Sequence, residues 1–200
     1  MSPRALVLPR CRPDEVGVDP GGVVALLDAL ASAHLELHSL HVVRHGRVLA
    51  EGYWEPYRPE HPVLVHSLSK SFTSAAVGIA VADGAFGYDD LLVDLFVDAV
   101  DAARVGPRTR SIRVRDCLAM ATGHESDPVL PMSVMGRHGR EPFAEFLAVE
   151  PTGEPGVTFC YNQWATYTLA EVVRRTTGRD VLTLLNERLF GPLGITDAVW

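Results

Sequence analysis

The sequence predicts a mixed α and β fold in which two strands come first and a long helical stretch follows. Two β-rich runs, 37–44 and 47–54, are joined at His45-Gly46, a pair that is typical of a hairpin turn. From residue 67 onward the apolar residues recur mostly at helical spacing, and nothing after residue 160 reads as a strand. Because two strands alone form only a marginal sheet, we expect them to need further strands as partners.

The elements follow from local signals. A helix is predicted over 19–33, because Asp19 suits a cap, Pro20 suits a first helical position, and the apolar residues of 23–30 share one face. A second helix is predicted over 67–83 and ends at Gly84. Apolar residues cover nearly every face of this helix, so we expect it to be buried.

Shorter elements fill the remainder. Helices are predicted over 88–97, 114–121 and 141–149, with loops at 101–111 and 126–139. Residues 155–156 read as a turn and 157–160 as extended. The last two predicted helices are 163–177, which Gly178 ends, and 180–189, which Asp180 caps. Residues 193–200 carry no cap and no polar tail, so we expect the sequence to be incomplete.

Composition excludes several classes of protein. The chain has 200 residues, a formal net charge of -7 and no basic run, which argues against nucleic acid as a partner. The apolar start is short and is broken by Pro9, and no apolar run approaches the roughly 20 residues of a membrane span. We therefore expect a cytoplasmic protein with no membrane partner, and its oligomeric state stays open.

Neither a metal nor another cofactor is expected. The three cysteines have no close spacing, which favours buried or idle thiols over a disulfide or a metal site. Histidines at 34, 38, 41 and 45 imitate a helical metal face. However, residues 38–45 read as a strand, in which His38 and His41 point to opposite sides. His66 and His124 are read as wall residues or buried donors.

One imbalance in composition singles out a residue. The 18 basic residues are arginines except for Lys70. Codon usage explains an excess of arginine, but arginine cannot lose its proton in a protein, whereas lysine can. A position that keeps lysine against this bias is a candidate for a deprotonable amine.

Ser67 lies three positions before that lysine, and residues at this spacing share one face of a helix. A serine hydroxyl is a weak nucleophile that needs a base within hydrogen-bond reach, and a neutral lysine amine can supply it. The spacing alone is weak evidence, since chance produces it in roughly one such sequence in twenty. Its position at the start of an apolar helix strengthens it.

The residues around this pair carry a family resemblance. Residues 66–74, His-Ser-Leu-Ser-Lys-Ser-Phe-Thr-Ser, resemble the nucleophile motif of the superfamily of class C beta-lactamases, penicillin-binding proteins and family VIII esterases. Four further stretches resemble family motifs in the same order. They are Gly87-Tyr88-Asp89-Asp90, residues 112–123, residues 155–162 and residues 189–195. The resemblance covers roughly residues 14–200 of the chain.

The resemblance implies a fold and a set of roles. The fold would be an antiparallel sheet flanked by helices, with a helical region beside it. Residues 1–200 would form a single incomplete domain, with the first helix and strands in 14–64 and the nucleophile helix and helical region in 65–200. Ser67 would form an acyl-enzyme, Lys70 would take its proton, and Tyr161 would share in proton transfer.

Two departures qualify that reading. The second family motif is usually Tyr-x-Asn, whereas this chain has Tyr161-Asn162-Gln163, so the amide that binds substrate would be Gln163 or Asn162. The third motif is Lys-Thr-Gly or His-x-Gly on a strand. The lysine form is impossible with one lysine, Thr176-Thr177-Gly178 reads as a helix end, and His138-Gly139 comes before the second motif. We expect the third motif beyond residue 200.

Two functions therefore stay open. The first is a serine hydrolase that acts on small esters or amides. The second is a non-catalytic beta-lactamase-like binding protein, or an inactive fragment.

Overall fold

The computed structural model describes residues 8–126 and 141–200, and it divides the chain into two compact units between Leu64 and Val65. The predicted loop at 126–139, with His138-Gly139, lies almost wholly outside the described residues. That the two units form a single domain stays a prediction.

The N-terminal unit contains the two predicted strands and the first helix. Helix α1, Pro20–Ser32, starts at Asp19, whose carboxylate accepts a hydrogen bond from the Gly21 amide at 2.9 Å. Strands β1, Ser39–Arg44, and β2, Arg47–Tyr53, pair antiparallel around His45-Gly46. Both turn residues have positive φ, 51° and 70°, as a tight two-residue hairpin requires. None of the described residues of this unit is buried.

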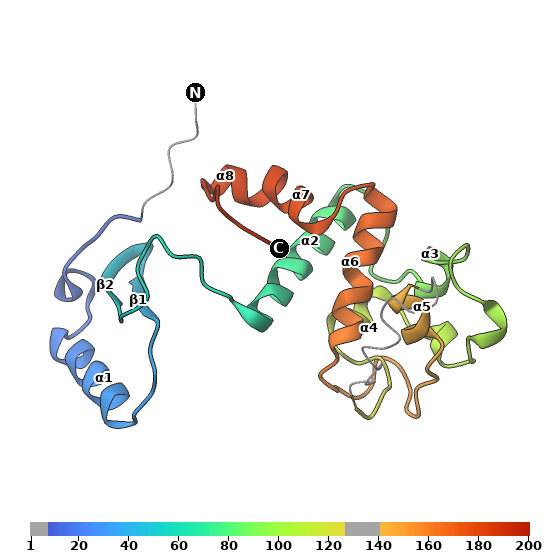
Figure 1. Ribbon diagram of the computed structural model, residues 1–200, viewed down its shortest axis with the longest axis horizontal. Helices are drawn as coiled ribbons and strands as arrows, with labels where there is room; N and C mark the ends of the chain where they lie inside the picture. The colour runs from blue at the N-terminus through green and yellow to red at the C-terminus, as the bar shows by residue number, and fades with distance from the viewer. Residues whose placement is uncertain (1–7, 127–140) are drawn as a thin grey trace. The chain divides into compact units, whose positions relative to one another are not determined.

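The C-terminal unit is helical and holds the core. Its α-helices are α2, Ser69–Ala82; α3, Leu92–Leu95; α4, Val114–Leu118; α5, Pro142–Leu147; α6, Gln163–Thr177; α7, Val181–Leu185; and α8, Gly191–Leu193. Short 3₁₀ turns occur at His66–Leu68, Ala102–Arg104 and Thr109–Ser111, and a π-type turn, Asn186–Phe190, joins α7 to α8. Helix α2 packs against α6 and α7, and α6 also contacts α4 and α5 (Figure 1).

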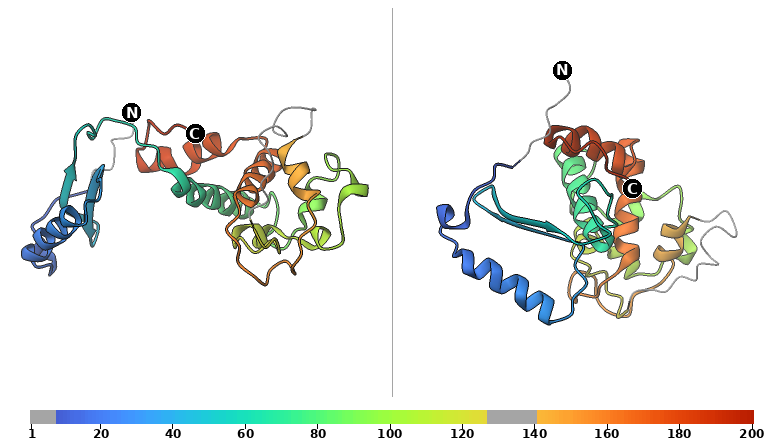
Figure 2. Two further views of the ribbon diagram at one scale, coloured as in Figure 1. Left: turned by 60° about the horizontal axis from the view of Figure 1, so that its bottom comes forward. Right: turned by 60° about the vertical axis from the view of Figure 1, so that its left-hand side comes forward.

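Helix α6 has the predicted bounds because its signals agree. Ala165, Leu169, Val172 and Val173 are all buried, and their spacing places them on one face. Gly178 follows the last turn with a φ of 71°, the left-handed conformation that ends many helices. Two views from other sides show α6 running beside α2 (Figure 2).

Helix α2 is less buried than its composition predicts. Thr73, Ala76, Val77 and Ala80 are buried, but the apolar residues on its other faces are only partly covered. Among the described residues, α6 and α7 cover one side of the helix. The expectation of complete burial is therefore wrong for the remaining faces.

The predicted helix at 88–97 is also wrong over its first half. The Arg115 amide donates to the Tyr88 carbonyl at 3.0 Å, and the Val114 amide donates to the Asp90 carbonyl at 3.1 Å. These bonds hold a turn at 88–89 and a single bridge residue, Leu91, against residues 113–115, so the helix is confined to α3. Such long-range pairing overrides a local amphipathic pattern.

Candidate active site

Ser67 lies in a 3₁₀ turn, His66–Leu68, that directly precedes α2. The turn starts at His66, which has a φ of 47°, a left-handed conformation that is uncommon outside glycine. The Ser69 hydroxyl donates to the His66 carbonyl at 2.7 Å and the Leu68 amide donates to the Val65 carbonyl at 3.0 Å. These bonds fix the turn and leave Ser67 exposed at its surface.

Lys70 lies in the first turn of α2 and reaches back to Ser67. Its Nζ donates to Ser67 Oγ at 3.2 Å, the contact that the three-residue spacing predicts. The lysine is half-buried, whereas the serine is exposed.

Tyr161 lies 94 residues after Ser67 in the sequence, and its hydroxyl donates to Ser67 Oγ at 2.8 Å. The Lys70 amine lies 5.1 Å from the centre of the tyrosine ring, within the range of a cation–π contact. The structure thus brings together the three residues for which catalysis is predicted, with the serine oxygen between an amine and a phenol.

Two chain segments, residues 120–123 and residues 153–160, are joined by backbone hydrogen bonds and position Tyr161, which follows the second segment. The Cys160 amide donates to the Met120 carbonyl at 2.8 Å, and the Gly156 amide donates to the Ala121 carbonyl at 2.7 Å. Met120 has a φ of 51°, which ends α4 before the predicted residue 121 and turns the chain toward this pairing. Residues 120–123 therefore fix the position of the segment that leads to Tyr161.

The two segments approach most closely at a pair of glycines. The Gly153 amide donates to the Gly123 carbonyl at 2.9 Å. A Cβ on Gly123 would lie 2.5 Å from the Gly153 carbonyl oxygen, which is closer than real Cβ contacts come. Only glycine at position 123 allows this approach.

Asn162 is fully buried, and both ends of its amide are engaged. Its Oδ1 accepts hydrogen bonds from the amides of Trp164 at 2.9 Å and Ala165 at 3.1 Å, which makes it the cap of α6. Its Nδ2 donates to Thr122 Oγ1 at 3.2 Å. Asn162 thus ties the start of α6 to the segment that supports Tyr161.

The hydrogen-bonded chain continues from Thr122 to His124, which the sequence predicts to be a wall residue or a buried donor and which is buried in the structure. Thr122 Oγ1 lies 2.9 Å from His124 Nδ1, and His124 Nε2 lies 3.0 Å from the Val149 carbonyl oxygen. Because a carbonyl only accepts, Nε2 carries the proton in this bond, and in the neutral imidazole Nδ1 then accepts from the threonine hydroxyl. No local pattern predicts such a link between residues so far apart.

Gln163, the other candidate amide, is the first residue of α6 and is exposed. It follows Asn162 immediately, so the two amides of the motif have different surroundings. One is enclosed in the protein, and the other is at the surface two residues from Tyr161.

Among the residues that the structure describes, no group of three or more His, Cys, Asp or Glu side chains could hold a metal ion. No helix in the described ranges is long and apolar enough to span a membrane. Burial raises the pKa of the Cys117 thiol, which disfavours its thiolate. In the part of the chain that the structure describes, the Lys70 amine and the Tyr161 hydroxyl lie within hydrogen-bond distance of Ser67 Oγ.

The chain matches a family model described as Beta-lactamase over residues 27–200. A search of curated proteins found no match.

Solved structures share the fold. The chain is similar to a candidate beta-lactamase from Bacteroides dorei, with 20% identity, a TM-score of 0.70, and coverage of 89% of this chain and 52% of that one. A candidate 6-aminohexanoate-dimer hydrolase from Bacillus anthracis matches with 18% identity, a TM-score of 0.67, and coverage of 94% and 53%. SurE, solved with D-leucine, matches with 26% identity, a TM-score of 0.64, and coverage of 87% and 40%. The chain therefore spans about half the length of the first two, or less in SurE.

Proposed function

The chain belongs to the beta-lactamase family, and on that premise we propose that it is a serine hydrolase that cleaves small esters or amides through an acyl-enzyme on Ser67. The observation that carries the proposal is the position of Ser67 Oγ, 3.2 Å from the Lys70 amine and 2.8 Å from the Tyr161 hydroxyl. A nucleophile and its base within hydrogen-bond reach are what covalent acyl transfer requires.

The proposed reaction begins when Ser67 Oγ attacks the carbonyl carbon of the substrate. A neutral Lys70 amine accepts the serine proton, and the carbonyl oxygen takes up the electron pair of its π bond. When the tetrahedral intermediate collapses, the bond to the leaving group breaks and Tyr161, with Lys70, returns the proton to the leaving oxygen or nitrogen. Water then attacks the acyl-enzyme, releasing a carboxylic acid and regenerating the Ser67 hydroxyl.

The two amides of the second motif are proposed to divide their roles. Gln163 is exposed beside Tyr161 and is suited to a substrate contact. Asn162 is fully buried with its amide bonded to backbone groups and to Thr122, so it acts on substrate through the position of Tyr161. Asn162 is thus a positioning residue in this proposal.

That the protein is located in the cytoplasm stays a prediction.

The alternative is a beta-lactamase-like binding protein without activity, or an inactive fragment. What favours this alternative is that the third family motif does not occur on a strand of the described residues. In the described residues, the strands are β1 and β2, and neither carries Lys-Thr-Gly or His-x-Gly. Thr176-Thr177-Gly178 ends α6, and this supports its reading as a helix end.

A covalent label separates the two functions. The protein from its complete reading frame would be incubated with a fluorophosphonate and, separately, with a penicillin, and the modified peptide would be identified by mass spectrometry. We expect a fluorophosphonate adduct on Ser67 and none in Ser67→Ala. Ser69→Ala is the matched control, because Ser69 bonds the His66 carbonyl and should leave labelling of Ser67 in place. A full-length protein that stays unmodified at Ser67 would favour the non-catalytic reading.

A further inference from the structure

His124 is a buried histidine whose ring is held in one orientation. It directly follows residues 120–123 and is 7% exposed, whereas the other histidines that the structure describes are exposed. Its ring packs against Phe146 of α5, with the ring centres 5.2 Å apart. Its Nε2 lies 3.0 Å from the Val149 carbonyl oxygen, just after α5, and its Nδ1 lies 2.9 Å from Thr122 Oγ1. Both ring nitrogens are therefore engaged.

Backbone groups fix the direction of hydrogen bonding at both ends of this network. At one end, Asn162 Oδ1 accepts from two backbone amides at the start of α6, so its Nδ2 faces Thr122 Oγ1, which accepts at 3.2 Å. At the other end, the Val149 carbonyl only accepts, so His124 carries a proton on Nε2. The one hydrogen of the Thr122 hydroxyl is then donated to Nδ1 of the neutral imidazole.

The Nδ1 acceptor keeps the hydrogen of the Thr122 hydroxyl turned away from Asn162. Thr122 is 1% exposed, and a buried hydroxyl that loses its acceptor is costly to leave unpaired. Without Nδ1 the hydroxyl rotates, and in some orientations its hydrogen meets the hydrogens of Asn162 Nδ2. Two donors that face each other repel, so the asparagine amide is no longer held in one position. His124 thus determines whether Thr122 can accept from Asn162.

Asn162 connects the network to the proposed reaction centre. It directly follows Tyr161 in the chain, and the tyrosine hydroxyl donates to Ser67 Oγ at 2.8 Å. Because Asn162 is the fully buried cap of α6, a shift of its side chain moves the backbone beside Tyr161. A displacement of about 1 Å at a reacting group can lower a rate by about 100-fold.

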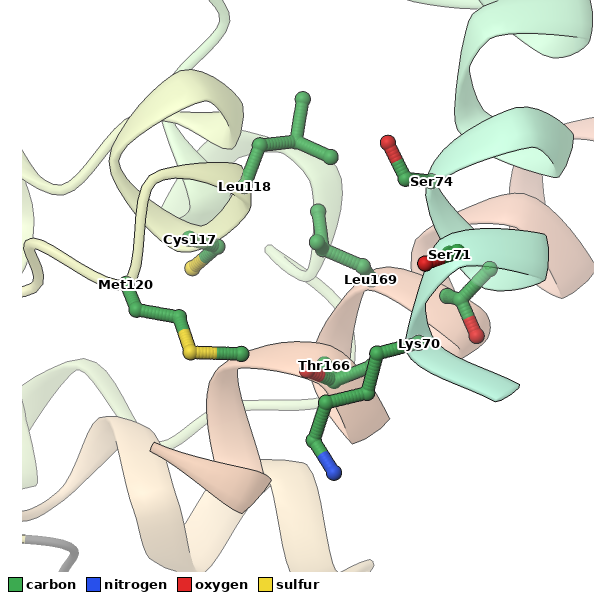
Figure 3. A pocket seen from close by; sticks show the side chains of 9 residues that line it. Lys70, Ser71, Ser74, Cys117, Leu118, Met120, Thr166 and Leu169 are labelled. Carbon is green, nitrogen blue, oxygen red and sulfur yellow. The ribbon is translucent and has the colours of Figure 1, made fainter. Parts of the chain in front are cut away.

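The same network borders the side of the site on which Lys70 lies. Met120 begins the segment that leads to Thr122, and it lines the same hollow as Lys70. Its side chain extends toward Thr166 of α6 (Figure 3). The segment that carries Thr122 therefore borders the surroundings of the lysine as well as those of the tyrosine.

We propose that His124 is a positioning residue for catalysis. By accepting the hydrogen of the Thr122 hydroxyl at Nδ1, it fixes the amide of Asn162. The asparagine in turn holds Tyr161 in the orientation that proton transfer to and from Ser67 requires. The inference rests on the proposed hydrolase function. Because His124 is buried and acts through other residues, its loss should lower kcat and leave KM nearly unchanged.

Two substitutions of His124 separate its two hydrogen bonds. In His124→Asn the side-chain oxygen takes the place of Nδ1 and accepts from Thr122, while the bond to Val149 is lost. In His124→Gln the side-chain nitrogen takes the place of Nε2 and donates to Val149, while Thr122 loses its acceptor. Both variants lose the aromatic ring, so each serves as the matched control for the other.

The two variants should differ in turnover of p-nitrophenyl acetate by the protein from its complete reading frame. We expect His124→Gln to lower kcat about 10- to 100-fold and to change KM less than about threefold, and His124→Asn to keep kcat within about threefold of the wild type. The rate at which the fluorophosphonate modifies Ser67 should fall in the same order. The melting temperature shows whether each variant is folded. Equal kcat values in the two variants, or a lower kcat in His124→Asn, would overturn the inference.

Thr122 provides a second test that does not depend on the folding of the histidine variants. Thr122→Val has no hydroxyl, so it should lower kcat as much as His124→Gln does. Thr122→Ser keeps the hydroxyl and should keep most of kcat. A folded Thr122→Val variant with the kcat of the wild type would overturn the inference, because the connection from His124 to Asn162 runs through that hydroxyl.

The outcomes separate this inference from the function on which it rests. Turnover with an adduct on Ser67, but with a kcat that the His124 and Thr122 variants leave unchanged, would overturn the inference and leave the hydrolase function standing. Failure of the wild type to cleave the ester, together with no fluorophosphonate adduct on Ser67, would remove both.

Discussion

The oxygen of Ser67 accepts hydrogen bonds from two groups that can each exchange a proton with it. The amine of Lys70 comes from the first turn of α2, just after the turn that holds Ser67, and the phenol of Tyr161 comes from the residue before the cap of α6. The first contact follows from sequence spacing. The second depends on how the chain folds, and the family resemblance rather than any local pattern predicted it.

Lys70→Arg tests whether the amine acts as a base. Arginine keeps the positive charge and much of the stem but cannot deprotonate in a protein. We expect kcat/KM for an activated ester to fall by at least about 100-fold, the usual contribution of a general base. The melting temperature serves as the control for folding. A variant that keeps wild-type kcat/KM would show that the amine serves only as a positive charge.

Asn162→Ala should lower stability and turnover together. The substitution removes the cap of α6 and the bond to Thr122, at a cost of about 1–3 kcal/mol in the free energy of unfolding. Gln163→Ala should instead raise KM while the melting temperature and kcat change little. Chemical denaturation would measure the free energy of unfolding of both variants, and steady-state kinetics would measure their kcat and KM.

Asn162→Ser separates the two bonds of Asn162. Serine still caps a helix but has no donor that reaches Thr122 in place of Nδ2. If the hydrogen bond to Thr122 positions Tyr161, this variant keeps most of the free energy of unfolding but has a lower kcat. Unchanged kcat in Asn162→Ser would mean that the residue acts only as a cap.

At the scale of elements, the bonding of residues 120–123 to 153–160 positions Tyr161 more than any helix does. These residues form no regular strand, and their pairing rests on three backbone hydrogen bonds and one close approach of glycines. Sequence periodicity predicted α6 to the residue, because cap, apolar face and stop all agree. Periodicity predicted helix at 88–91 and up to residue 121, and both predictions were wrong. At these places the backbone is held by hydrogen bonds to residues that are distant in the sequence.

Gly123→Ala should destabilise the protein more than Gly84→Ala. Both glycines have left-handed φ, 83° and 77°, so both substitutions cost about 1–2 kcal/mol in backbone strain. A Cβ at Gly84 meets nothing within 4 Å, whereas one at Gly123 meets the Gly153 carbonyl at 2.5 Å. We expect a total loss of about 2–5 kcal/mol for Gly123→Ala, measured by urea denaturation. Equal losses for the two variants would argue against the close approach.

At the scale of the whole molecule, burial is unequal between the two units. The large buried side chains, among them Phe96, Phe143 and Phe146, belong to the C-terminal unit, whereas the described residues of the N-terminal unit are all at least partly exposed. The predicted order of strands followed by helices is confirmed. Which faces of α2 stay uncovered could not be predicted, because an apolar helix does not indicate how many neighbours it has.

Hydrogen exchange on the 200-residue chain should reflect this inequality. Amides of β1 and β2 should exchange much faster than those of α2 and α6, because an isolated hairpin is marginally stable and buried helices open only with the core. Mass spectrometry of proteolytic fragments resolves these segments. Equal protection of the hairpin and the helices from exchange would contradict the finding that the buried core lies in the C-terminal unit.

The lone lysine makes the proposed active site visible to spectroscopy. Since Lys70 is the only lysine in the chain, protein grown with ¹⁵N-lysine carries its label at a single residue, and its side-chain nitrogen gives a resonance without overlap. The chemical shift of that nitrogen, followed against pH, records whether the amine beside Ser67 is charged. Acylation of Ser67 should move the same signal, so that one atom reports both the state of the base and the progress of the reaction.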